Sequence, residues 1–312
     1  MSGPAARPHP SWRIAAVVVS VASLAWVLWL LAAAWPDLSA HRRELRVGPL
    51  LEGFTLATLG SVCAFAAFVI LARMFGISGL SRRDYAHFYF TGQLLKHLPG
   101  RIWGIGYQWA ANPAIGSFQN WLLANLAHLL LAAYFALWIA ALVLASLHVP
   151  WWGAAVLLAG SVCYAAGWRI AALLANLPWP GWVPDRLGRL REGIALSLAR
   201  ASSAQRAWIF CCFLASSLCY YLSWYLYGES YPPLGAKDGV QLCAYYMIAW
   251  LVGYLSLLTP SGLGVRELAF AWMAKDFPGD SIAYLAVVGR ASLLAVDLLL
   301  GLVSVPLSPR KR

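Results

Sequence analysis

Apolar stretches of about 20 residues, separated by shorter polar stretches, recur along the whole sequence. A stretch of this length is what a helix needs to cross a bilayer while satisfying its own backbone hydrogen bonds. The pattern therefore predicts an all-α fold, a polytopic integral membrane helical bundle that forms a single membrane domain over residues 1–312. The simple spans are predicted at Ile14–Trp35, Leu50–Ala72, Phe118–Leu147, Trp151–Leu174, Ala207–Tyr227, Val240–Leu258 and Ile282–Val305.

Two segments depart from this simple pattern. Tyr85–Ala110 is interrupted by Lys96-His97-Leu98-Pro99-Gly100-Arg101, and Leu258 is followed by Thr259-Pro260-Ser261-Gly262-Leu263-Gly264-Val265-Arg266-Glu267. Proline removes a backbone donor and glycine relaxes helical geometry, so both stretches should break a helix. Broken backbone and charge at membrane depth are tolerated where they are buried in protein or line a watery cavity. We therefore predict two Pro/Gly-broken or re-entrant segments that form a site.

Two further regions are predicted to lie outside the bilayer. The Pro-rich residues 1–11 are expected to be a disordered tail, and residues 176–206 form a cytoplasmic connection. Within this connection, apolar residues at helical spacing alternate with arginines, which indicates a basic amphipathic helix on the membrane surface. It either recruits anionic head groups or simply rests on the inner leaflet. The residues of this pattern are Leu187, Leu190, Ile194 and Leu198 with Arg186, Arg189, Arg191 and Arg200.

Composition excludes a soluble protein, because only 11% of the residues are charged and 61% are hydrophobic, whereas soluble domains carry about 25% charged residues. The net charge of +11 would suggest nucleic acid in a soluble chain. Here the basic residues follow the positive-inside bias, so we expect anionic lipid and no nucleic acid as the partner. The six cysteines show no CxxC spacing, so no metal or other cofactor is predicted.

The distribution of Lys and Arg predicts a chain in the inner (cytoplasmic) membrane with a cytoplasmic N-terminus. Arg73, Arg82 and Arg83 fall in a connection assigned to the cytoplasm, whereas the turn at His148 has no Lys or Arg. Arg42, Arg43 and Arg46 argue against this orientation. A cytoplasmic tail requires Pro260–Phe277 to complete one crossing, which gives about eight crossings and is the interpretation we prefer. A re-entrant Pro260–Phe277 would place the tail outside.

The first broken segment has the chemistry of an anion site. Lys96 and Arg101 bracket Pro99-Gly100, and Trp103 adds an amphipathic ring. Cations beside freed backbone amides suit a phosphate or another anionic head group. The alternative is a cytoplasmic loop whose basic residues anchor the chain at the interface.

The second broken segment combines a helix break with an ionic pair. Gly262 and Gly264 permit close backbone approach after Pro260, and the Arg266 guanidinium is a planar fork for anions. Glu267 either neutralises a basic partner or carries a proton. The alternative is an Arg-Glu pair at an ordinary interfacial loop.

The last predicted helix carries Arg290 and Asp297, which lie seven residues apart and therefore on one face. We predict that they pair with Glu267 and with Lys96 or Arg101 respectively, which gathers the intramembrane charges in one cavity. A purely structural ion-pair network is the alternative. Asn125 and His128 form a weaker polar pair, with His128 expected to make interhelical hydrogen bonds.

At the two broken segments, Lys96–Trp103 and Thr259–Glu267, the chain resembles the lysylphosphatidylglycerol synthase/flippase transmembrane family. The order and separation of the motifs match, although Pro-Ser-Gly stands where the family pattern has Pro-Gly-Gly. The resemblance implies a cavity open to one leaflet at a time, with the broken segments meeting near its centre. Family members include the lipid-flipping half of the multiple peptide resistance factor and proteins that accompany glycan and polyprenyl-lipid pathways. Bifunctional members append an aminoacyl-transferase domain, and because this sequence stops at Arg312 we expect no lysine transfer.

We therefore predict a flippase-like lipid translocase for an anionic phospholipid or a polyprenyl-phosphate-linked head group. Lys96, Arg101 and Arg266 would hold the phosphate, while Glu267, Arg290 and Asp297 would balance charge. The sequence has no GxxxxGK[ST] motif, so passive or ion-coupled transport is expected.

One alternative is an integral-membrane transferase that acts on a polyprenyl-linked substrate. Its candidate carboxylates are Glu229, Asp238 and Asp280. Another alternative is a non-transporting partner of proteins in a glycan or lipid pathway.

Overall fold

The computed structural model describes residues 45–95, 118–176, 194, 201–231, 234–255, 262 and 264–307. Within these ranges the chain is helical and has no strand, so the predicted all-α class is confirmed. The helices are α2 (Val47–Met74), α3 (Arg82–Leu95), α5 (Phe118–His148), α6 (Pro150–Asn176), α8 (Ser203–Glu229), α9 (Ala236–Leu255), α10 (Val265–Met273) and α11 (Gly279–Ser304), followed by the short 3-10 turn η3 (Val305–Leu307).

Five of the described helices, α2, α5, α6, α8 and α11, are long and apolar enough to cross a membrane. Their bounds lie within a few residues of the predicted spans, which fits a multi-pass membrane protein. The predicted crossing Val240–Leu258 corresponds to α9, which is not one of these five helices. Ile14–Trp35 lies outside the described residues, as do the N-terminal tail and all of the predicted amphipathic helix except Ile194. The total of about eight crossings therefore stays a prediction.

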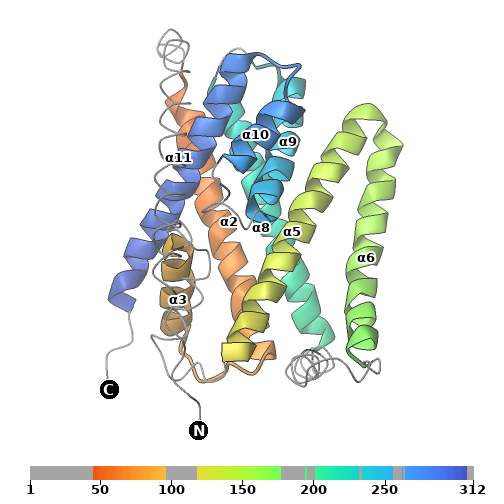
Figure 1. Cartoon of the computed structure of the whole chain (residues 1–312), viewed down its shortest axis with the longest axis vertical. Coiled ribbons are helices and arrows are strands. Elements are labelled where there is room, and N and C mark those ends of the chain that lie inside the picture. Colours follow the sequence, from red (N-terminus) through yellow and green to blue (C-terminus); the bar gives the residue numbers. More distant parts are fainter. Residues whose placement is uncertain are drawn as a thin grey trace, which may run out of the picture.

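Helices α9 and α10 form an antiparallel pair (Figure 1). The Tyr245 ring lies 6.3 Å from that of Phe277, and the Tyr246 ring lies 5.0 Å from that of Phe270. Helix α10 thus returns the chain to the end of the bundle where α9 begins. Its helix has nine residues, about 13 Å in length. The return fits the cytoplasmic tail that was predicted, and whether Pro260–Phe277 makes a full crossing stays a prediction.

Helix α11 then runs the length of the bundle and ends beside α3 (Figure 1). His87 Nδ1 of α3 lies 3.0 Å from the Ser304 carbonyl oxygen, and both residues are buried. The end of α11 therefore lies on the same side of the bundle as the basic connection between α2 and α3. This is the arrangement that a predicted cytoplasmic tail requires.

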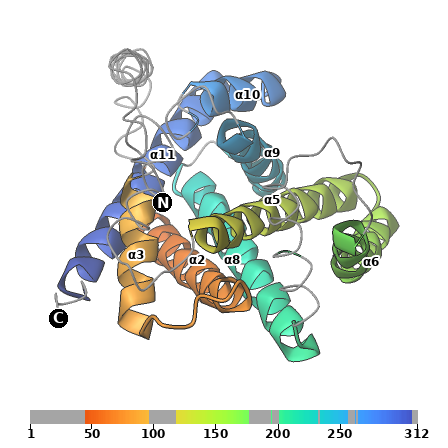
Figure 2. The same ribbon diagram turned by 60° about the horizontal axis from the view of Figure 1, so that its bottom comes forward.

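The centre of the bundle is built on close contact between α2 and α8, which lie side by side in Figure 2. Small residues of α2 recur three or four positions apart on the buried face, at Gly53, Ala57, Gly60 and Ala64. A Cβ atom on Gly60 would lie 3.2 Å from both the Ser216 carbonyl oxygen and the Cys219 Cβ. In lipid, close approach of this kind supplies much of the packing energy between helices.

Helices α5 and α6 form a hairpin, with α6 at the periphery of the bundle (Figures 1 and 2). Pro150 is the first residue of α6, a position where its missing N–H costs nothing. Trp138 Nε1 of α5 donates a hydrogen bond to the Val156 carbonyl oxygen at 2.9 Å. Large apolar side chains on α6, including Leu158 and Leu173, are exposed, as expected for a helix that faces lipid.

The seam between α2 and α8 leads to a prediction about stability. Gly60→Leu should lower the thermal stability of the protein in detergent, by about 1–3 kcal/mol from overpacking, because the added side chain has no room against α8. The matched control is Gly48→Leu, since a Cβ atom at Gly48 meets nothing within 4 Å. Equal melting temperatures for the two variants would contradict the close packing of α2 on α8.

Candidate functional site in the central cavity

Helix α10 begins at a pair of glycines whose backbone is left-handed. Gly262 has φ of 70° and Gly264 has φ of 80°, values that side chains with a Cβ atom rarely adopt. Gly264 is the N-cap of α10, and its backbone N–H donates to Glu267 Oε2 at 2.9 Å. A carboxylate at this position satisfies a free backbone donor and faces the positive end of the helix.

The glycine loop packs directly against the backbone of α9. A Cβ atom on Gly262 would overlap the Gly253 carbonyl group, and one on Gly253 would lie 2.7 Å from Arg266 Cβ. Gly262 thus makes the close backbone approach that the sequence predicts. Gly253 is its partner, and sequence reasoning missed it. Together the two glycines place Arg266 inside the bundle, where it is only 4% exposed.

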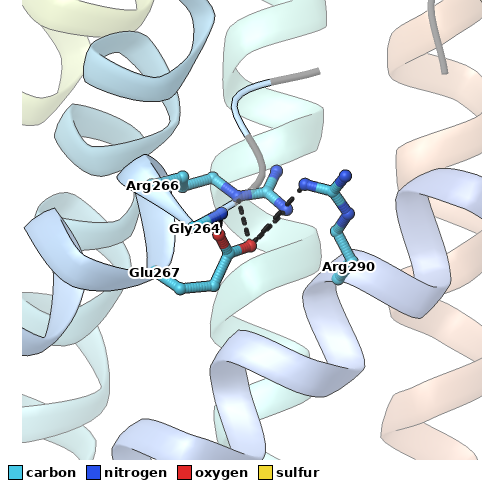
Figure 3. A network of polar contacts seen from close by, with 4 residues as sticks. All are labelled: Gly264, Arg266, Glu267 and Arg290. Atoms are coloured by element: carbon cyan, nitrogen blue, oxygen red, sulfur yellow. Dashed lines mark hydrogen bonds and ion pairs between the residues drawn. The ribbon is translucent and has the colours of Figure 1, made fainter. Parts of the chain in front are cut away.

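Arg266, Glu267 and Arg290 form one ionic cluster (Figure 3). Arg266 Nε and Nη2 donate to Glu267 Oε1 at 3.2 and 3.0 Å, and Arg290 Nη1 lies 3.6 Å from the same oxygen. The predicted pairing of Arg290 with Glu267 is therefore confirmed. Two guanidinium groups share one carboxylate, so the cluster carries one net positive charge.

Aromatic rings support the cluster from the side of α9 and α8. Arg266 Cζ lies 5.4 Å from the centroid of the Tyr246 ring, a cation–π distance. The Tyr246 ring stacks on Trp224 with centroids 3.8 Å apart. Trp224 in turn lies against Gly289 of α11, where a Cβ atom would overlap the indole ring. The stack thereby connects the guanidinium of α10 to α9, α8 and α11.

A cavity of about 130 Å³ opens beside this cluster. One water molecule requires roughly 10–15 Å³, so the cavity has room for a polar group with its hydration. Among the described residues, seven helices contribute to its wall, and the charged side chains on it are Arg266, Arg290 and Asp297. These three predicted intramembrane charges therefore meet at one cavity. Its uncharged polar and aromatic wall includes Tyr89, Gln93, His128, Ser216, Ser217, Tyr220, Trp224, Trp250 and Tyr254.

Part of the predicted site lies outside the described residues, namely Lys96, Pro99, Gly100, Arg101, Trp103 and Pro260. The predicted pairing of Asp297 with Lys96 or Arg101 stays a prediction for this reason. Asp297 itself is buried, at 7% exposure. Gln93 of α3 lines the cavity and precedes Lys96 by three residues in the sequence.

His128 makes the interhelical contacts that the sequence predicts. Its Nε2 lies 3.2 Å from the Ala64 carbonyl oxygen of α2 and 3.3 Å from the Tyr89 hydroxyl of α3. Asn125 differs, because its Nδ2 donates to the Trp121 carbonyl oxygen of its own helix at 2.9 Å. His128 thus connects α5 with α2 and α3 at the cavity wall.

The three carboxylates considered for a transferase have other positions. Asp280 accepts hydrogen bonds from the Tyr231 hydroxyl and the Ser281 N–H, both at 2.8 Å, in the first turn of α11. Glu229 ends α8, and Asp238 lies in the first turn of α9. None of the three is among the described residues that line the central cavity.

Comparisons of the chain with protein-family models, curated proteins and solved structures find no match. The resemblance carried by the two broken segments therefore stays a prediction.

The contact between Gly253 and Arg266 can be tested in α9 itself. Gly253→Ala should destabilise the protein by about 1–3 kcal/mol, because the new methyl group overlaps Arg266 Cβ. Gly239→Ala in the same helix is the control, since its nearest contact is an ordinary 3.9 Å. Thermal unfolding in detergent measures both variants. A Gly253→Ala variant as stable as Gly239→Ala would contradict the close packing of Arg266 against Gly253 of α9.

The shared carboxylate leads to a second stability prediction. Glu267→Gln should cost about 3–5 kcal/mol, because it leaves two buried guanidinium groups without their counter-charge. The double variant Glu267→Gln with Arg290→Met should recover part of this loss, since one of those charges is then removed. The melting temperatures of the single and double variants measure these losses. If the effects of the two substitutions simply add, the proposed charge coupling between Glu267 and Arg290 is excluded.

Proposed function

We propose that this protein is a flippase-like lipid translocase. The head group of an anionic phospholipid or polyprenyl-phosphate-linked lipid would enter the central cavity while its tail stays in the bilayer. The supporting observation is the buried cluster of Arg266, Glu267 and Arg290, with one net positive charge, at the wall of a polar cavity. Charges of this kind within a membrane bundle are costly and usually serve a substrate pathway.

Arg266 is the proposed head-group contact. Two of its nitrogens are held by Glu267, while Nη1 has no hydrogen-bond partner among the described residues. A guanidinium fixed on one edge presents its remaining donors in a defined direction, which suits the oxygens of a phosphate. Glu267 therefore serves as a positioning residue for Arg266.

The net charge of the cluster suits transport better than permanent binding. Two unpaired arginines would hold a phosphodiester tightly, whereas one shared carboxylate reduces the attraction to that of a single positive charge. Asp297 lies two helical turns further along α11 on the same cavity wall. We assign it to balancing charge as the head group moves, together with the proposed contribution of Lys96 and Arg101.

The remaining cavity wall suits the neutral parts of a head group. The hydroxyl groups of Ser216, Ser217 and Tyr220 can exchange hydrogen bonds with glycerol or sugar hydroxyls. The Gly262–Glu267 segment, which builds the cluster, also supports the proposed relation to the lysylphosphatidylglycerol synthase/flippase transmembrane family.

The proposal predicts leaflet exchange in vesicles that contain the purified protein and phosphatidylglycerol with a fluorescent head group. Exchange measured by dithionite quenching should exceed that of protein-free vesicles. Arg266→Gln should slow it about tenfold or more, because a charged hydrogen bond to the head group is lost. Arg82→Gln, at an exposed arginine that begins α3, is the control.

The thermal stability of Arg266→Gln is measured together with its exchange rate, so that a loss of exchange is not mistaken for unfolding. Arg266→Lys is a second variant that keeps the charge. Exchange at the wild-type rate in folded Arg266→Gln would contradict the assigned contact. Product formation from a polyprenyl-linked sugar donor, without exchange, would favour a transferase.

A further inference from the structure

An apolar groove lies on the far side of α5 from the central cavity, between α2, α5 and α6. It has a volume of about 310 Å³, and its walls include Met74, Leu131 and Trp168. Two tyrosines also line it, but their hydroxyl groups are occupied by backbone carbonyl groups. Tyr134 donates to Gly160 and Tyr164 donates to Arg206. The groove therefore presents ring faces and aliphatic carbon.

The groove lies where α6 separates from α5, at the last of three glycines in a row on α6. Gly153, Gly160 and Gly167 are seven residues apart and share one face of the helix. Added Cβ atoms at the first two would overlap Ser146 and Trp138 of α5, whereas one at Gly167 would meet nothing within 4 Å. Gly167 also lines the groove, so the space opens where the third glycine leaves it unfilled.

One end of the groove is marked by positive charge. Arg206 Cζ, at the start of α8, lies 5.6 Å from the centroid of the Trp168 ring, which forms part of the groove wall. Arg73 directly precedes Met74, and Arg169 directly follows Trp168; both arginines are exposed. This end of the bundle is predicted to face the cytoplasmic leaflet, where anionic lipids attract Arg and Lys.

We propose that this groove is a resident site for one anionic phospholipid. An acyl chain lies along the apolar wall between α5 and α6, and the phosphate lies beside Arg206. Both parts of the ligand have a counterpart, since the wall of the apolar groove includes Trp168, against which the Arg206 guanidinium lies. A free phosphate would leave the groove empty, and a neutral lipid would gain no attraction from the positive charge of Arg206, Arg73 and Arg169.

The groove and the central cavity share α5 as a common wall. Ala127, Leu131 and Tyr134 face the groove, whereas His128, Ala132 and Ala136 face the cavity. A lipid in the groove therefore packs against the back of the helix that carries His128. The site is separate from the proposed head-group contact at Arg266 and does not depend on the proposed translocase function.

Native mass spectrometry of the full chain tests the site, with phosphatidylglycerol or phosphatidylcholine of identical acyl chains added to delipidated protein. The wild-type protein should bind the first phosphatidylglycerol at least tenfold more tightly than phosphatidylcholine. Gly167→Leu should weaken this binding about tenfold, because the new side chain fills the groove. Ala165→Leu adds a similar volume at an exposed position of α6 outside the groove and should bind like the wild type.

Two further variants test the position of the head group. Arg206→Gln should remove the preference for phosphatidylglycerol while phosphatidylcholine binding persists. Arg82→Gln, at an exposed arginine that does not line the groove, should leave the tight binding unchanged. If Gly167→Leu does not fold, Leu130→Trp fills the same groove from α5.

Wild-type affinity for phosphatidylglycerol in a folded groove-filling variant would overturn the proposal. So would equal binding of the two lipids by the wild-type protein, or loss of the tight binding in Arg82→Gln.

Discussion

The carboxylate of Glu267 is the contact on which the centre of this protein depends. It accepts hydrogen bonds from the Gly264 backbone at the start of α10 and from the Arg266 side chain, and it lies within ion-pair distance of Arg290 on α11. Without it, the buried Arg266 guanidinium would lose its carboxylate partner and the partly buried Arg290 would lose this counter-charge, which is strongly unfavourable inside a bundle of apolar helices. One side chain thus caps α10, orients Arg266 and joins α10 to α11.

Close packing makes this arrangement possible. Gly253 and Gly262 allow the loop before α10 to lie directly on α9, and Gly289 allows Trp224 of α8 to lie directly on α11. Between them, Tyr246 stacks on Trp224 and faces the Arg266 guanidinium. The cluster is therefore fixed by backbone contacts and rings from four helices. A site held this rigidly can keep its charges in place while a head group enters and leaves the adjacent cavity, as we propose.

Much of the fold could be predicted from the sequence, because long apolar runs such as Phe118–Leu147 permit only one secondary structure in lipid. The helix break at Gly262 and Gly264 and the pairing of Glu267 with Arg290 could also be predicted, since both follow from local chemistry. The contact between Gly253 and Gly262 could not, because it depends on how α9 and the loop meet in space. Trp224 was missed for a related reason. Its central position depends on the contacts with Tyr246 of α9 and Gly289 of α11, which no local sequence pattern shows.

The extent of the Pro260–Phe277 segment could not be read from local chemistry. It was inferred from the basic tail, because a cytoplasmic tail requires the chain to return after α9. The described part of this return includes a helix of nine residues, and Phe270 and Phe277 pack against α9. Backbone breaks have local causes, whereas the length of a segment depends on the partner helix.

The central claim is that the Arg266 cluster makes the cavity attract anions. A single cysteine at the cavity wall, Ser217→Cys in an otherwise cysteine-free chain, tests it with two thiol reagents of equal reactivity, one carrying a sulfonate and one a trimethylammonium group. The claim predicts faster modification by the sulfonate reagent, with the ratio of rates falling when Arg266→Gln is added. Faster reaction of the cationic reagent, a ratio that ignores Arg266→Gln, or no modification by either reagent would contradict it.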